Sequence, residues 1–204
     1  LDFYLGLNAK FPSLPRQEGG HGILDHAFPL DKYAPGQNWP KEIMPVHDGK
    51  KLVLPPPAED KPLENQVVYK ANWHPCFSNP KTVEIAVKNI LETMTADPHR
   101  QWIGLGVMDR GGHCECDACR KAVASERNAM GLPNYSDLYY AWVNSVVRRV
   151  AEQYPEVYFG VLAYREVFNP PSFDLHPHIV PSLTVDVHQM MTPEVREEKW
   201  KQIK

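Results

Sequence analysis

From residue 67 onward the sequence alternates short apolar segments with longer amphipathic ones, and this alternation restricts the folds open to the chain. Four segments have the composition of buried or half-buried strands: 67–69, 102–108, 157–164 and 182–190. Two segments carry apolar side chains at spacings of three and four residues, as amphipathic helices do: 80–96 and 136–154. Ser78 or Asn79 can cap the first helix, which has Pro80 at its first position, and Ser136 is expected to cap the second. Strands that alternate with helices of this length form a parallel sheet through right-handed crossovers.

The fold class predicted from this pattern is α/β. With an apolar strand-like run at 1–7, the chain has about five strands, fewer than a closed eight-stranded barrel needs. We therefore expect a segment of a TIM-type (β/α)8 barrel that is incomplete in this chain. A doubly wound open sheet is the alternative, because the periodicity alone does not exclude it.

The length of 204 residues predicts a single domain, in which two regions differ in composition and in the regularity of their pattern. Residues 11–62 form a long loop region rich in Pro and Gly, and residues 67–204 form regular βα units. Long loops in compact domains are often functional, so 11–62 either shapes one wall of a site or packs on the surface without a direct role. Within it, the Gly-rich stretch 19–22 lacks the strand-then-helix context of a phosphate loop.

Composition limits the partners. The formal net charge is −3 with interspersed signs, which leaves no basic face for nucleic acid. No apolar run is long enough for a membrane span, so a small or neutral ligand is expected. The first residue is Leu1 within an apolar run, and the last stretch has a helical pattern without a stop signal. We therefore expect a segment of a longer protein, with the remaining domains of that protein as partners.

Ligands bind at the carboxyl ends of the strands in both candidate architectures. Polar and aromatic residues follow each predicted strand: Trp73 and His74, then Asp109 and Arg110, then Tyr164, Arg165 and Glu166, and finally Asp186 and His188. Carboxylates beside aromatic rings suit sugar recognition and general acid/base chemistry, because a pyranose has hydroxyls at its rim and C–H groups on its face. Each residue alone could be a structural cap or ion pair, but their recurrence at successive strand ends favours a site.

The four cysteines give the sharpest local signal. Cys114, Cys116 and Cys119 form a C-x-C-x-x-C cluster after one predicted strand, and Cys76 follows the preceding one, so neighbouring loops can bring all four together. Four thiolates would make a closed structural Zn²⁺ site with no part in catalysis, and His113 could replace one thiolate. Two disulfides or four free thiols are the alternatives, although a bridge within C-x-C is geometrically awkward.

Three stretches resemble the bacterial domain-of-unknown-function family 4838: 74–80 (HPCFSNP), 107–119 (VMDRGGHCECDAC) and 135–164. The resemblance covers roughly residues 32–190. That family is similar to glycoside hydrolase barrels of the α-glucuronidase and β-hexosaminidase kind. The resemblance implies a glycosidase-like barrel that is common in larger exported or surface-associated bacterial proteins, with carbohydrate as the ligand.

In the related hydrolases the general acid follows the fourth barrel strand, which the resemblance places at Asp109. The hexosaminidase group carries an Asp-Glu pair there and the α-glucuronidases a Glu, whereas here Asp109 is followed by Arg110. The resulting expectation is a glycoside hydrolase in which Asp109 protonates the leaving oxygen and Glu166 or Asp186 is the second carboxylate. The residues expected to position the sugar are Trp73, His74, Arg110, Tyr164, Arg165 and His188. A non-catalytic carbohydrate-binding barrel and a metal-stabilised structural domain are the alternatives.

Overall fold

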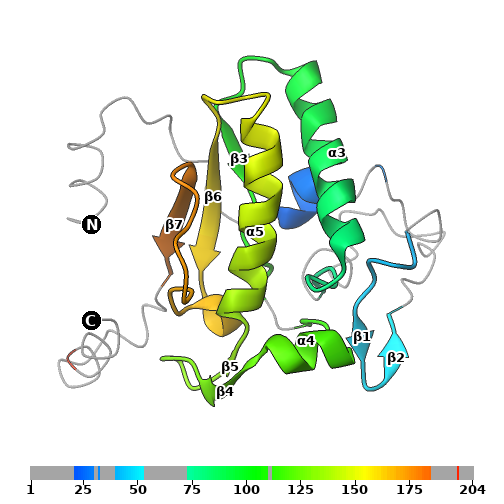
Figure 1. Cartoon of the computed structure of the whole chain (residues 1–204), viewed down its shortest axis with the longest axis vertical. Helices are drawn as coiled ribbons and strands as arrows, with labels where there is room; N and C mark the ends of the chain where they lie inside the picture. Colours follow the sequence, from blue (N-terminus) through cyan, green and yellow to red (C-terminus); the bar gives the residue numbers. More distant parts are fainter. Residues whose placement is uncertain are drawn as a thin grey trace, which may run out of the picture.

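The computed structural model describes residues 21–29, 32, 40–52, 73–109, 112–184 and 197. Its centre is a parallel sheet in the order β3-β6-β7, made of β3 (Trp102–Gly104), β6 (Tyr158–Ala163) and β7 (Ile179–Leu183). Two long helices, α3 (Pro80–Ala96) and α5 (Ser136–Ala151), pack against each other on one face of the sheet (Figure 1). A π-helical turn, η1 (Ile23–Ala27), contacts both α3 and β3.

The parallel sheet and its covering helices confirm the α/β prediction. Across the described ranges the sheet is open, and its membership in a larger barrel stays a prediction. The predicted strands at 1–7 and 67–69 lie outside the described residues, as does the part of the predicted strand 182–190 beyond Thr184. Strand β7 begins earlier than predicted, at Ile179.

Helix α3 forms as its sequence predicts. The side chain of Asn79 accepts a hydrogen bond from the backbone N–H of Lys81 at 3.0 Å, and Pro80 occupies the first turn, where its missing N–H costs nothing. The helix buries one stripe of apolar side chains: Val83, Ala86, Ile90 and Met94. This stripe fixes the face that α3 turns toward the core.

Helix α5 starts differently from the expected Ser136 cap. Ser136 is buried as the first helical residue, and Tyr135 at the N-cap makes no side-chain cap bond. The side chain of Asn134 instead accepts a hydrogen bond from the backbone N–H of Ser136 at 3.1 Å. The expected Ser136 cap was wrong because the Asn134 amide reaches the backbone two residues on, as in an Asx turn.

Strand β3 pairs with β6 over fewer residues than the apolar run 102–108 predicted. The backbone N–H of Leu105 still donates to the carbonyl of Gly160 at 2.7 Å, but the following groups find other partners. The carbonyl of Gly106 accepts from Ile23 N at 3.2 Å, and the N–H of Met108 donates to Nε2 of His74 at 2.9 Å. The run is thus buried as predicted, while its backbone is satisfied by distant segments.

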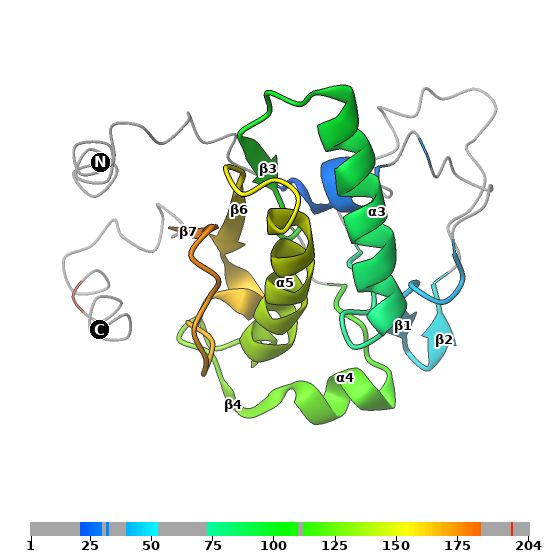
Figure 2. The ribbon, with the colours of Figure 1, turned by 45° about the horizontal axis from the view of Figure 1, so that its top comes forward.

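Smaller elements surround this centre. They are the hairpin of β1 (Val46–His47) and β2 (Lys50–Lys51), the short helix α4 (Asp117–Ala122), the hairpin of β4 (Ala124–Arg127) and β5 (Pro133–Asn134), and the 3-10 turn η3 (Arg165–Val167). The β1–β2 hairpin lies beside α4 and the amino-terminal end of α3 (Figures 1 and 2). Among the described residues, no helix combines the length and apolar character needed to cross a bilayer.

Candidate functional site

The four cysteines converge in one cluster, as the sequence predicted. Their Sγ atoms all lie within 4.8 Å of one another, and Sγ of Cys76 lies 3.7 Å from that of Cys119 and 3.8 Å from that of Cys116. All four are free, and all but the half-buried Cys116 are buried. A tetrahedron with Zn–S bonds of about 2.3 Å has sulfurs about 3.8 Å apart, so the two separations from Cys76 are compatible with ligands of one tetrahedral ion.

Polar groups that can hydrogen-bond to sulfur surround the cluster. The backbone N–H of Val46 donates to Sγ of Cys114 at 3.3 Å. The hydroxyl oxygen of Ser78 lies 3.1 Å from Sγ of Cys119 and 3.3 Å from Sγ of Cys76. If the thiols were ionised, the Val46 N–H and the Ser78 hydroxyl would donate to the thiolates, and contacts of this kind stabilise and orient metal ligands.

Within the cluster, Cys76 is the cysteine whose pKa is lowered. Hydrogen bonds from Cys114 first, and from Cys119 next, lower the pKa of Cys76 to about 2 despite its burial. The hydrogen bonds that Cys119 shares with Cys114 and Cys76 raise its own pKa far above the usual range. Four sulfurs at this separation therefore need a cation before all of them can carry charge.

The cluster holds part of the Pro- and Gly-rich region against the βα units. The backbone N–H of Cys76 donates to the carbonyl of Ile43 at 2.8 Å, and the N–H of Glu115 donates to the carbonyl of Val46 at 2.8 Å. The side chain of Glu115 also accepts from the N–H of Asp48 at 3.2 Å. The loop region at 40–52 is thus fixed by the same two loops that carry the cysteines.

The predicted carboxylates Asp109 and Glu166 follow the neighbouring strands β3 and β6, and their surroundings differ. The Asp109 side chain is 64% exposed, whereas that of Glu166 is 13% exposed. Oε2 of Glu166 lies 3.4 Å from Nε of Arg165 and 3.9 Å from Nε2 of His113. Arg165 takes a left-handed backbone conformation with φ of 49°, which is uncommon for a non-glycine residue and typical of functional turns.

His113, beside Cys114 in the chain, lies between two other rings. Its ring centroid is 4.2 Å from that of His74 and 4.5 Å from that of Tyr135, with nearly parallel planes. Burial lowers the pKa of His113 to about 3 and that of His74 well below its usual value, so both rings are neutral. This stack connects the cysteine cluster to Glu166 at the sheet edge.

The remaining predicted sugar-positioning residues occupy different places. Trp73 and His74 are each 1% exposed and lie in the core below the edge. Tyr164 is partly exposed, and its pKa is raised by burial first and by the charge of Asp109 next. Three predicted site residues lie outside the described residues: Arg110, Asp186 and His188.

Sequence reasoning missed two residues at this edge. Nε2 of His21, from the Gly-rich stretch, lies 3.2 Å from Oδ1 of Asp109. The buried Asn128 donates from Nδ2 to the carbonyl of Arg165 at 2.5 Å. The neighbouring Gly22 is required by the packing, because a Cβ there would lie 2.6 Å from the carbonyl oxygen of Gly104, but this clash is visible only in the folded structure. Glycine at that position permits close backbone approach to the end of β3.

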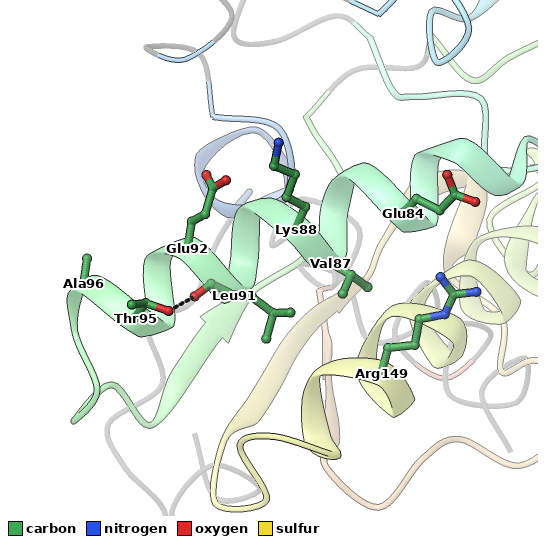
Figure 3. A pocket seen from close by; sticks show the side chains of 8 residues that line it. All are labelled: Glu84, Val87, Lys88, Leu91, Glu92, Thr95, Ala96 and Arg149. Atoms are coloured by element: carbon green, nitrogen blue, oxygen red, sulfur yellow. Dashed lines mark hydrogen bonds between the residues drawn. The ribbon is translucent and has the colours of Figure 1, made fainter.

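An open groove of about 700 Å³ lies elsewhere, on the helical face. Val87 and Leu91 of α3 line it, and Glu84 and Lys88 of α3 and Arg149 of α5 stand around it (Figure 3). It contains none of the predicted site residues. The predicted carboxylates that the structure describes lie instead at the carboxyl edge of the sheet, the edge at which parallel α/β sheets bind ligands.

Comparison with known proteins agrees with the family resemblance. Residues 19–203 match the family model described as "Domain of unknown function (DUF4838)". Neither a curated protein nor a solved structure matches the chain. Since the match spans most of the sequence, the chain belongs to the domain-of-unknown-function family DUF4838.

Proposed function

We propose that this domain hydrolyses a glycan at the carboxyl edge of its parallel sheet. The observation that carries the proposal is the placement of Asp109 and Glu166 after the adjacent strands β3 and β6, one exposed and one largely buried. Glycoside hydrolysis uses two carboxyl groups in different environments, so that one donates a proton while the other remains ionised.

The surroundings of the two groups support a division of roles. Arg165 pairs with Glu166 at 3.4 Å, and a carboxylate held in such an ion pair suits a nucleophile or a general base. Asp109 is accessible and has His21 as a partner, which suits the acid that protonates the leaving oxygen. The Tyr164 phenol, whose pKa is raised by burial, has an O–H that can donate to a sugar hydroxyl.

The cysteine cluster supports a structural zinc ion in the same domain. Four thiolates would fill the tetrahedral coordination of Zn²⁺ and leave no open position for water or substrate. The ion would tie the loop at 76–79 to the loop at 112–119 and thereby hold the β1–β2 hairpin. Its part is to hold the loops in place, while Asp109 and Glu166 carry the chemistry.

The direct test is turnover of a panel of aryl glycosides by the full chain and by two variants. We expect Asp109→Asn and Glu166→Gln each to lower kcat/KM by about 10²–10⁴-fold on the accepted sugar. Glu84→Gln, an exposed carboxylate change on α3, is the matched control and should retain full activity. Equal turnover by wild type and both site variants would exclude these carboxylates from the mechanism.

A non-catalytic carbohydrate-binding domain is the second candidate. It is favoured by Arg110, which stands where the hexosaminidase-type sites carry a second adjacent carboxylate. Calorimetric glycan binding without hydrolysis, with affinity reduced in Tyr164→Phe and Arg165→Ala, would support this candidate. If neither binding nor hydrolysis is found for any glycan, a metal-stabilised structural domain explains the cysteine cluster alone.

A further inference from the structure

The imidazole of His21 is held in one protonation pattern by the backbone of the strand end. Its Nδ1 forms a hydrogen bond with the carbonyl oxygen of Val107, 86 residues away in the sequence. A carbonyl oxygen only accepts hydrogen bonds, so Nδ1 must carry a proton. In a neutral ring Nε2 is then the unprotonated nitrogen.

The position of this proton determines how His21 can contact Asp109. Nε2 of His21 lies 3.2 Å from Oδ1 of Asp109. A neutral imidazole with the proton on Nδ1 and an ionised carboxylate would face each other with two acceptors, which repel. The contact is attractive only when one proton lies between the two atoms, carried either by the ring or by the carboxyl group.

We propose that His21 and Asp109 form a proton-sharing pair, in which His21 is the positioning residue that holds the acidic proton of Asp109 at the sheet edge. This inference rests on the proposed glycoside hydrolysis and deepens it.

The fold orients the pair from the His21 side. The backbone N–H of Ile23 donates to the carbonyl of Gly106 at 3.2 Å, which fixes the segment along the extension of β3. Gly22 permits this approach, because any side chain there would collide with the backbone of Gly104. Two anchors, one through the backbone and one through Nδ1, leave the Nε2 atom aimed at Asp109, as a preorganised proton donor requires.

The step itself is a simple proton transfer. The shared proton moves to the leaving-group oxygen as the glycosidic C–O bond breaks, and the bonding electrons go to that oxygen. The leaving group departs as a neutral alcohol, and the pair is left one proton short. A water molecule that attacks the anomeric carbon returns a proton to the pair and completes the hydrolysis.

The pair can be tested without substrate by ¹⁵N NMR of the His21 imidazole in the full chain. We expect a protonated Nδ1 in wild type and in Asp109→Asn, and an Nε2 signal that changes between the two proteins. A ring that carries its proton on Nε2 alone, or an Nε2 signal insensitive to Asp109→Asn, would overturn the pair. His99, an exposed histidine remote from the edge, is the internal reference and should not respond.

The kinetic test compares two side chains that each retain one of the two His21 contacts. The amide of Asn corresponds in position to Nδ1 and that of Gln to Nε2, so His21→Asn keeps the Val107 contact and His21→Gln keeps the Asp109 contact. On glycosides with alkyl leaving groups we expect His21→Asn to lower kcat about 10–10²-fold with little change in KM, and His21→Gln to restore part of it.

Dinitrophenyl glycosides separate proton donation from general damage, because their leaving group departs without protonation. On these substrates both His21 variants should retain near wild-type kcat, as should His99→Asn on all substrates. Full activity of His21→Asn on alkyl glycosides would refute the positioning role while leaving the proposed hydrolysis intact. If wild type hydrolyses no glycoside, the proposed function fails, and the NMR measurement still decides whether the pair shares a proton.

Discussion

The backbone N–H of Val46 donates a hydrogen bond to Sγ of Cys114 at 3.3 Å, although 68 residues separate them in the sequence. This contact ties the β1–β2 hairpin to the cysteine cluster, and it is strongest when the sulfur is an ionised thiolate. A metal that ionises Cys114 therefore also secures the hairpin. The order of the Pro- and Gly-rich region at 40–52 is consequently expected to depend on metal occupancy.

Removal of the metal is the first prediction. Protein purified without chelator should contain about one equivalent of zinc, and a strong chelator should release it. Metal binding contributes directly to folding free energy, so a loss of about 3 kcal/mol or more, or roughly 6–12 °C in Tm, is expected. Hydrogen exchange should rise at 43–52 and 76–79 before it rises in β6. Zinc below a few tenths of an equivalent, together with an absence of titratable thiols, would indicate disulfides instead.

Ser78 gives a sharper test of the same site. Its hydroxyl contacts the sulfurs of Cys76 and Cys119 without being a ligand itself. Ser78→Ala should lower zinc affinity by about 10–100-fold at unchanged stoichiometry, as does the loss of other groups that hydrogen-bond to metal ligands. Competition with a chromophoric chelator measures this affinity. Ser145→Ala removes a serine hydroxyl that bonds only within α5 and is the matched control. Equal affinities for the two variants would contradict the arrangement.

Asn128 should affect both the environment of Glu166 at the sheet edge and the free energy of unfolding. Its Oδ1 accepts from the N–H groups of Met130 and Leu132 at 3.0 Å each, and its Nδ2 donates to the carbonyl of Arg165. Asn144 is the matched control, because it is also buried and fixes a loop through the carbonyl of Asp174 and the N–H of His176. Either change to Ala should cost about 2–4 kcal/mol in denaturant unfolding.

Only Asn128→Ala is expected to change the environment of Glu166, because it releases the strained backbone at Arg165. The NMR signal of the Glu166 carboxyl carbon should shift in Asn128→Ala and stay constant in Asn144→Ala. A shift of the same size in both variants would show that the signal follows stability alone.

We expect the hydroxyl groups of two tyrosines of α5 to contribute differently to the free energy of unfolding. The hydroxyl of Tyr139 donates to the carbonyl of Leu105 at 2.8 Å, and that of Tyr140 donates to the carbonyl of Val167 at 3.3 Å, both in buried surroundings. Tyr139→Phe should cost about 1–2 kcal/mol of unfolding free energy, because Leu105 at the end of β3 loses a short bond. Tyr140→Phe should cost less, under about 1 kcal/mol. Thermal or urea unfolding of both variants checks the order, and a larger loss for Tyr140→Phe would contradict it.

Local sequence signals predicted the elements well where a single segment carries the information. The Asn79-Pro80 start and the apolar stripe of α3 agree with the structure, because capping and amphipathic periodicity act within one helix. The start of α5 was misassigned to Ser136, since the choice between two neighbouring polar side chains depends on which one reaches the free N–H. The length of β3 was overestimated, because burial sets the apolar run while strand pairing depends on a neighbour.

The sequence by itself determined a parallel α/β arrangement and placed the four cysteines in adjacent loops. Both inferences depend only on the periodicity of consecutive residues and on the order of the predicted strands. Tertiary structure alone decided which groups meet at the sheet edge. His21 reaches Asp109 only because the segment before η1 runs beside β3, and Glu166 lies 3.9 Å from His113 only because the loops after β3 and β6 meet. Contacts of this kind join residues with no shared local pattern, since they arise from the packing of whole segments against one another.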